Sequence, residues 1–329
     1  MNNLYPIKFD PVFKDKIWGG DKIKSILNKE YSPLPNCGET WEISSVEGNV
    51  SVVANGSLKG TDLRKLIREY RGELVGQNVY KIFGDEFPLL IKFIDANDDL
   101  SIQVHPDDIL AKKRHGSFGK TEMWYILQAD EGSSLISGFN REMDKELYLE
   151  SFNKGELTRV LNKESAKERD IFFIPAGRVH TIGKGLLLAE IQQTSDVTYR
   201  IFDFDRKDEK GNQRDLHVEE ALEAIDYHYY GQYKTPYKPE ENKAVNVVTC
   251  DYFQTNVISL NKEIHRDYHA LDSFIILIAT GGSTAIHYKG GSENITKGEV
   301  VLLPASLKEV TLIPKGTARL LETFVPLKP

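Results

Sequence analysis

Cysteine is scarce in this sequence. The 329 residues include two cysteines, Cys37 and Cys250, which lie far apart and in no metal-binding spacing. A disulfide framework needs several cysteines, and thiolate metal sites usually place them in closely spaced pairs. The sequence therefore excludes a disulfide-stabilised scaffold and indicates two reduced thiols, as in cytosolic proteins.

Excess positive charge and long apolar runs are also lacking. The chain has 42 Lys and Arg residues against 49 Asp and Glu residues, and its formal net charge of −7 argues against a nucleic-acid partner. Two or three local cations suffice for a small phosphorylated ligand, so the net charge leaves that class open. No run approaches membrane-span length, and residues 1–13 contain no signal-peptide core. We predict a cytoplasmic protein without nucleic-acid, membrane or obligate protein partners.

Short runs with β-type composition dominate the chain. Turn residues such as Gly, Asn, Asp and Pro separate them, a pattern typical of an all-β sandwich or barrel. The runs cover residues 49–55, 88–96, 101–105, 122–129, 170–176, 186–193, 197–204, 256–260, 273–280, 300–305 and 309–314. Helical spacing is confined to residues 60–76, 144–162 and 217–227. Residues 228–243, rich in Tyr, Lys, Gly and Pro, are the best candidate for a linker.

Two pairs of runs suggest an internal repeat. EMWYILQA (122–129) resembles DSFIILIA (272–279), and IFFIPAGRVH (171–180) resembles VVLLPASLKE (300–309), in the same order along the chain. Chance resemblance between β-runs is common, so coincidence is the alternative. A true duplication predicts two similar β-barrels, one within residues 1–235 and one within 236–329.

Polar side chains share one face of a predicted strand in LSIQVHPDD (100–108). Gln103 and His105 alternate with apolar residues, and Pro106 then ends the strand. Downstream, PAGRVH (175–180) fits a proline–glycine hairpin that presents His180, and Glu122 opens another run. Two imidazoles, a carboxylate and an amide or water suit Zn²⁺, Mn²⁺ or Fe²⁺. For each residue alone, the alternative is a polar group at an exposed strand end.

The second copy of the repeat lacks this set. Ser306 replaces the hairpin glycine, Glu309 stands in the place of His180, and Asp272 alone aligns with Glu122. We therefore predict that the domain at 236–329 holds no metal. Three histidines in that part are expected to be surface or hairpin residues, namely His265, His269 and His287.

The hairpin and the duplicated barrel resemble the cupin superfamily, and longer strings resemble the type I mannose-6-phosphate isomerases in their short bacterial form. These strings are WGG (18–20), GETWEIS (38–44), FPLLIKFIDANDDLSIQVHPDD (87–108), GKTEMWYIL (119–127) and SDVTYRIFDFDR (195–206). The resemblance implies a mainly β fold of tandem cupin (jelly-roll-like) β-barrels with a small helical portion. It also implies one Zn²⁺ per chain, with four ligands: Gln103, His105, Glu122 and His180.

The same resemblance implies a reaction and roles for further residues. The reaction is the reversible aldose–ketose isomerisation of mannose 6-phosphate and fructose 6-phosphate through a cis-enediol. Arg200 corresponds to the family's catalytic arginine. Glu190 is the expected acid/base, with a pKa raised toward neutrality by its partly desolvated pocket. The candidates for contacts with the phosphate and the sugar hydroxyls are Lys92, Ser101, Lys120 and Glu39, whereas Trp124 is expected in the core.

Two other functions are compatible with a metal-binding cupin. One is a non-catalytic sugar-binding or regulatory protein, but a binder needs no proton-transfer group, and the chain retains Glu190 and Arg200. The other is a metal-dependent oxygenase, but such cupins usually carry more histidine at the metal than Gln103 and His105 supply.

Overall fold

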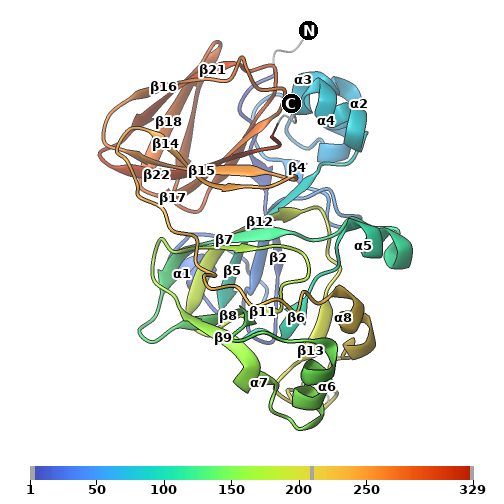
Figure 1. The fold of residues 1–329 in the computed structure, drawn as a ribbon. Helices are drawn as coiled ribbons and strands as arrows, with labels where there is room; N and C mark the ends of the chain where they lie inside the picture. Colours follow the sequence, from blue (N-terminus) through green and yellow to red (C-terminus); the bar gives the residue numbers. More distant parts are fainter. Residues whose placement is uncertain (1–3, 208–210, 327–329) are drawn as a thin grey trace.

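Antiparallel β-sheets are the main regular structure of the molecule, which the computed structural model describes over residues 4–207 and 211–326. The strands from Ala244 onward gather at one end, and most strands of the first two hundred residues gather at the other, whereas β4 (Val52–Val53) lies beside the C-terminal strands (Figure 1). The prediction of a mainly β fold with a small helical portion is confirmed.

Two sheets of the N-terminal part face each other across an apolar core. The six-stranded sheet has the order β10 (Ile171–Ile174), β7 (Glu122–Ala129), β12 (Leu186–Gln193), β5 (Leu89–Ala96), β3 (Glu39–Ile43) and β2 (Val12–Lys14). The five-stranded sheet has the order β13 (Tyr199–Phe202), β6 (Ile102–Val104), β11 (His180–Ile182), β8 (Ser134–Phe139) and β9 (Leu161–Ser165). Ile94 and Ile126 of the first sheet pack with Leu135 and Ile182 of the second. A short ribbon of β1 (Phe9–Asp10) and β4 (Val52–Val53) lies beside them.

The C-terminal part is a second pair of sheets with its own core. One sheet has the order β14 (Ala244–Thr249), β15 (Gln254–Leu260), β22 (Ala318–Phe324), β17 (Ile275–Gly281) and β20 (Val300–Leu303). The other has the order β16 (Ile264–Asp267), β21 (Glu309–Pro314), β18 (Ser283–Tyr288) and β19 (Gly291–Thr296). Between them lies a cluster that includes Leu277, Ile286 and Leu312.

The strand order of the first pair of sheets recurs in the second. The series β10-β7-β12-β5 corresponds to β20-β17-β22-β15, and β6-β11-β8-β9 corresponds to β16-β21-β18-β19. Each of these eight strands of the second half thus follows its counterpart by ten places in strand order; β14 is the exception, because it lies beside β15 whereas β3 lies beside β5. Such agreement in both sheets favours a duplication over a chance resemblance of β-runs.

The strand registers correct the expected alignment of the two copies. Glu122 pairs with Ile174, and its counterpart opposite Leu303 is Ile275 rather than Asp272. Asp272 instead accepts hydrogen bonds from the backbone N–H groups of residues 77 and 78. His180 pairs with Gln103 as Val310 pairs with Arg266, so Glu309 does not take the place of His180. Glu309 precedes Val310 by one residue, and a shift of one residue along a strand turns the side chain to the opposite face of the sheet.

The helices are short and lie between strands. They are α1 (Lys22–Ser25), α2 (Leu63–Tyr70), α3 (Gly72–Val75), α4 (Gln77–Phe83), α5 (Asp108–His115), α6 (Lys145–Asn153), α7 (Leu157–Val160) and α8 (Val218–Ala224). The three predicted helical regions are confirmed, except that residues 161–162 begin β9. Three helices, α1, α4 and α5, lie outside the predicted regions. In α5 the apolar residues are consecutive rather than at helical spacing, although Asp107 caps the helix by accepting from Leu110 N–H. Within the described ranges no helix combines the length and apolar character needed to cross a membrane.

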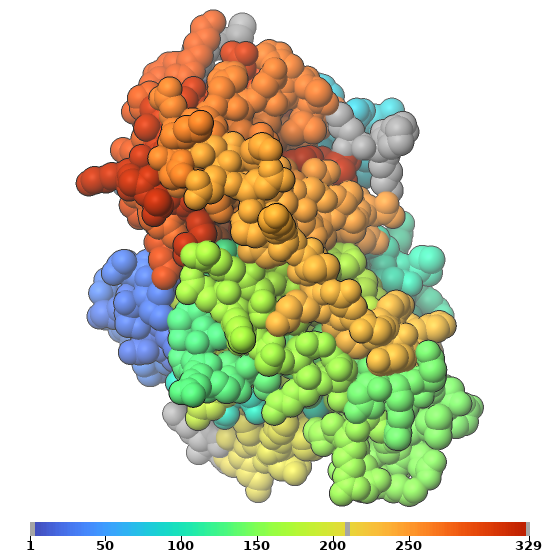
Figure 2. Space-filling model, turned by 60° about the vertical axis from the view of Figure 1, so that its left-hand side comes forward, coloured from blue at the N-terminus to red at the C-terminus, as the bar shows by residue number. Residues whose placement is uncertain are grey.

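The predicted linker, residues 228–243, contains no helix or strand but packs on the N-terminal half. It runs as a gold-to-orange band across the green surface in Figure 2. Tyr233 donates a hydrogen bond to the Phe139 carbonyl, and the Arg178 guanidinium lies 4.4 Å and 4.8 Å from the ring centres of Tyr230 and Tyr233. Side-chain contacts of Tyr230 and Tyr233 therefore attach the segment to the N-terminal half.

A charged network is buried in the C-terminal core. The fully buried Glu322 carboxylate accepts bonds of 2.9 Å and 2.8 Å from Arg266, and it also accepts hydrogen bonds from Tyr268 and Asn256. A bidentate guanidinium compensates a buried carboxylate well, whereas an unpaired one is costly.

We predict that Arg266→Met destabilises the protein by about 2–3 kcal/mol, because Glu322 would keep its charge without its cation. Urea unfolding measures the change. The matched control is Arg159→Met, which breaks an ion pair with Glu156 on the exposed surface and should cost less than about 1 kcal/mol. Equal effects of the two substitutions would contradict this account of the network.

Candidate functional site

A cavity of about 410 Å³ lies between strands of the two N-terminal sheets. Seven of the ten predicted site residues line it: Glu39, Lys92, Ser101, Gln103, Lys120, Glu190 and Arg200. The other three, His105, Glu122 and His180, are buried. His180 contacts Gln103 and Glu122 contacts Lys120 at the cavity wall, and His105 lies against Glu122. The fold thus brings all ten together from strands that are distant in sequence.

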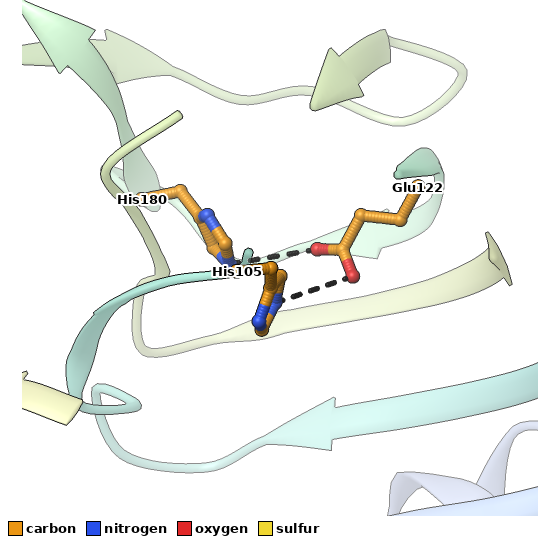
Figure 3. A group of neighbouring side chains, drawn as sticks. All are labelled: His105, Glu122 and His180. Atoms are coloured by element: carbon orange, nitrogen blue, oxygen red, sulfur yellow. Dashed lines mark ion pairs between the residues drawn. The ribbon is translucent and has the colours of Figure 1, made fainter. Parts of the chain in front are cut away.

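His105, Glu122 and His180 form a compact triad (Figure 3). The Nε2 atoms of His105 and His180 lie 3.6 Å and 3.5 Å from the two oxygens of the Glu122 carboxylate. The amide Nε2 of Gln103 lies 3.2 Å from Nε2 of His180, because these residues are directly paired on β6 and β11. Four potential ligand groups therefore converge on one point.

Backbone carbonyls orient both imidazoles of the triad. Nδ1 of His105 lies 3.1 Å from the Val197 carbonyl, and Nδ1 of His180 lies 2.8 Å from the Arg178 carbonyl. A carbonyl only accepts, so each Nδ1 carries the proton and each Nε2 presents a lone pair, which has no partner in His105 and faces the Gln103 amide in His180. Such outer contacts commonly orient histidine ligands of metals.

The triad is buried, and the Lys120 ammonium lies near both of its histidines. Burial lowers the pKa of His180 to about 4, and burial together with Lys120 holds the pKa of His105 well below its ordinary value. Both imidazoles are therefore neutral near pH 7, which is the form that binds metal. The buried Nε2 of His105 has no hydrogen-bond partner, a feature that an ion between these residues would explain.

Opposing effects act on the pKa of Glu122. Burial and the neighbouring Glu190 raise the pKa of Glu122 to about 7, while Lys120, with Nζ 3.1 Å from Oε2, opposes that rise. The indole N–H of Trp124 lies 3.1 Å from Glu122 and 3.0 Å from Glu190, so it bridges the two carboxylates. Trp124 is buried in the core, as predicted, but it also serves the site.

The expectation for the pKa of Glu190 is wrong in direction. Burial alone would raise this pKa, but Lys92, whose Nζ lies 3.1 Å away, and Lys120 lower it. Lys92 pairs with Glu190 in register on β5 and β12, and its ammonium also acts with Lys16 to lower the pKa of Glu39 to about 2 against the effect of burial. Desolvation was the predicted cause, but the cross-strand lysine outweighs it.

Arg200 reaches the cavity from β13, where it pairs with Gln103 of β6. Its Nη1 donates to the Asp215 carbonyl at 2.8 Å, and its buried Nε has no partner. Burial and the nearby Arg214, which also lines the cavity, lower the pKa of Arg200. A guanidinium stays protonated in spite of such a shift, so Arg200 presents a fixed charge.

The sequence analysis missed several residues of the cavity. The indole N–H of Trp41 donates to Glu39 at 2.8 Å, and Lys16 lies 3.4 Å from the same carboxylate. Trp41 and Trp124 each stand two residues after a site glutamate, so β alternation places tryptophan and glutamate on one face. That spacing was the available signal for both tryptophans. Arg214 gave no comparable signal, because it follows an irregular segment.

Comparison with known proteins identifies relatives of the chain. Residues 7–162 match the family described as "Phosphomannose isomerase type I, catalytic domain". Mannose-6-phosphate isomerase ManA of Bacillus subtilis is 35% identical over 311 residues, which cover 93% of this chain and 95% of that protein.

Solved structures agree with these sequence matches. The crystal structure of the Bacillus subtilis mannose 6-phosphate isomerase has a TM-score of 0.87 and 34% identity, covering 97% of this chain and 99% of that one. A mannose 6-phosphate isomerase bound with zinc and yttrium has a TM-score of 0.77, covering 98% and 100% of the two chains. Its identity of 16% supports the shared fold alone.

We predict that Lys92→Met destabilises the protein by about 3 kcal/mol at pH 7, because the buried Glu190 loses its cation. In the variant, burial should raise the pKa of Glu190 above its unfolded value. The folded state then binds the extra proton, so the deficit relative to the parent should shrink as the pH falls toward 5. Urea unfolding at both pH values measures this.

Lys16→Met is the matched control for this substitution. Lys16 also faces a cavity glutamate, but its side chain is 34% exposed, so solvent can replace the lost contact. A pH-independent deficit in Lys92→Met would contradict the assignment of its cause to Glu190.

Proposed function

The chain belongs to the type I phosphomannose isomerase family, and we propose that its cavity interconverts mannose 6-phosphate and fructose 6-phosphate with one zinc ion per chain. The observation that carries the proposal is the buried His105–Glu122–His180 triad beside a cavity lined with cations. Cations there suit a phosphorylated sugar, and the triad suits a borderline divalent metal.

The donor set fits zinc in both number and chemistry. His105 and His180 offer neutral Nε2 lone pairs, and Glu122 offers a carboxylate between them. A half-turn of the Gln103 amide exchanges its nitrogen and oxygen ends, which gives the fourth donor. Two imidazoles, a carboxylate and an amide oxygen complete a tetrahedral set.

Isomerisation moves a proton between C2 and C1 of the sugar through a cis-enediol. Zinc, when bound, supplies Lewis-acid stabilisation of negative charge on the sugar oxygens. Glu190 accepts the C2 proton and returns it to C1. Lys92 keeps the Glu190 carboxylate ionised at neutral pH, so the base is ready to accept a proton. The ion pair with Lys92 therefore keeps Glu190 in the basic form, whereas burial alone would raise its pKa.

Arg200 stabilises the charge that develops on the enediol oxygens, since its guanidinium is fixed at the cavity wall. Lys92 and Lys120 each already pair with a carboxylate, so their remaining N–H groups serve the sugar hydroxyls and phosphate oxygens. Ser101 and Glu39 complete the contacts with the substrate.

We also propose two domains in a tandem cupin arrangement, residues 1–235 and 236–329, with metal held between the sheets of the first alone. The repeated strand order supports the arrangement. By register and burial, the four ligand positions of the first half correspond to Arg266, Tyr268, Ile275 and Val310 in the second. There the guanidinium of Arg266, rather than a metal, compensates the buried carboxylate of Glu322.

A coupled assay of the purified protein with mannose 6-phosphate tests the proposed reaction. Fructose 6-phosphate should form, the activity should fall after chelation, and added zinc should restore it. Tight binding of mannose 6-phosphate without turnover in the zinc-loaded protein would instead indicate a sugar-binding protein.

We expect His180→Ala to lose both the cavity zinc and the activity, because three donors no longer complete the ligand set. Elemental analysis of desalted protein measures the zinc. His287→Ala, which removes an exposed histidine of the C-terminal half, is the control and should retain zinc and activity. Full zinc occupancy with normal activity in His180→Ala would refute the assignment of the ligands.

We expect Arg200→Ala to keep its zinc and its fold while kcat falls by about 10²–10³, because the charge that Arg200 stabilises exists only in the transition state. Arg200→Lys should recover part of the loss, since an ammonium lacks the planar fork of donors. Steady-state kinetics separate this role from phosphate binding, which would raise KM and leave kcat within about threefold of the parent.

A further inference from the structure

A second group of metal-ligating side chains lies on the outer face of the C-terminal half. His265 and Asp267 alternate along edge strand β16, so they project from one face, and His269 follows in the turn after the strand, where its backbone N–H donates to Asp267. Glu309 of β21 is paired directly opposite Asp267. The side chains of all four are 58–61% exposed, and those of Arg266 and Tyr268 point into the core between them.

The donor atoms of this outer group are close together. One ligand atom each from Asp267, His269 and Glu309 lies within 4.8 Å of the others. Nδ1 of His269 is 2.8 Å from Asp267 Oδ1, and Nε2 of His265 is 4.0 Å from Glu309 Oε1. The exposed side chains can therefore close on an ion without a change in the backbone.

The local charge also favours a cation. Among the described residues, no lysine or arginine forms an ion pair with Asp267 or Glu309, whose partners are His269 and His265. With neutral imidazoles, the group carries two negative charges and two nitrogen donors. Imidazole with carboxylate suits Zn²⁺, Cu²⁺ or Ni²⁺, whereas Ca²⁺ and Mg²⁺ need an all-oxygen shell.

We propose that Asp267, His269 and Glu309, with His265 as a fourth donor, bind a second divalent transition-metal ion independently of the cavity. The ion joins β16, an edge strand paired only through β21 among the described strands, to its neighbour. Because the ion binds only the folded strands, it stabilises the C-terminal half. The expectation of a metal-free C-terminal domain then applies to its interior alone.

The test uses Zn²⁺ as the probe and protein already loaded at the cavity. Zinc-loaded, desalted protein is titrated with Zn²⁺ by calorimetry, and bound metal is counted after equilibrium dialysis. We expect the stoichiometry to rise from one to two ions per chain, with a higher melting temperature. His269→Ala and, separately, Glu309→Gln should lose the second equivalent and the thermal shift while keeping activity.

Two controls make the result decisive. His228→Ala removes a more exposed histidine with the same 2.8 Å contact to an aspartate, and it should keep two equivalents because, among the described residues, no second carboxylate joins that pair. His180→Ala should lose the cavity ion and keep the outer one, which separates this proposal from the proposed function. A stoichiometry of one in the parent, or a second equivalent that survives both His269→Ala and Glu309→Gln, would overturn the proposal.

Discussion

The balance of charge around Glu122 is the constraint on which the rest of the site depends. This fully buried carboxylate lies beside another buried carboxylate, Glu190, and the Trp124 indole contacts both. Lys120 and Lys92 compensate the two charges, and the Trp124 indole bridges them. An uncompensated buried charge would cost several kcal/mol, so these side chains must come together as a set. A rigid β-scaffold supplies that set from neighbouring strands.

The two histidines next to these charges, His105 and His180, are neutral near pH 7. Burial disfavours protonation of His105 and His180, and Lys120, which compensates Glu122, acts in the same direction on both. With Nδ1 of each ring held by a backbone carbonyl, both Nε2 lone pairs turn to Glu122. Charge balance and ligand geometry are thus produced by the same contacts.

The two halves share a strand order but enclose different side chains between their sheets. In the first half the sheets enclose ligands and a cavity, and in the second they enclose apolar side chains and the Arg266–Glu322 pair. Glu190 and Glu322 occupy equivalent positions, opposite Trp124 and Leu277 respectively. The halves also share a core, in which the ring centres of Phe87 and Phe274 lie 4.4 Å apart. The C-terminal half therefore supports the half that carries the cavity.

The sequence by itself determined the mainly β fold and the three helical regions, and its resemblance to a family of isomerases indicated the ten residues that the structure brings together. Alternation of polar and apolar residues marks which face of a strand each side chain takes, and short motifs such as QVHPDD and PAGRVH carry the ligand types. What only the tertiary structure decided were the relations between strands. The direction of the Glu190 pKa shift depends on Lys92, which is paired with it on the neighbouring strand. The counterpart of Glu122 is Ile275, because the strand register and not sequence similarity decides which positions are equivalent. Helix α5 formed without amphipathic spacing, because its cap and its packing outweigh the pattern. These features depend on distances between residues remote in sequence, and local periodicity contains no information about such distances.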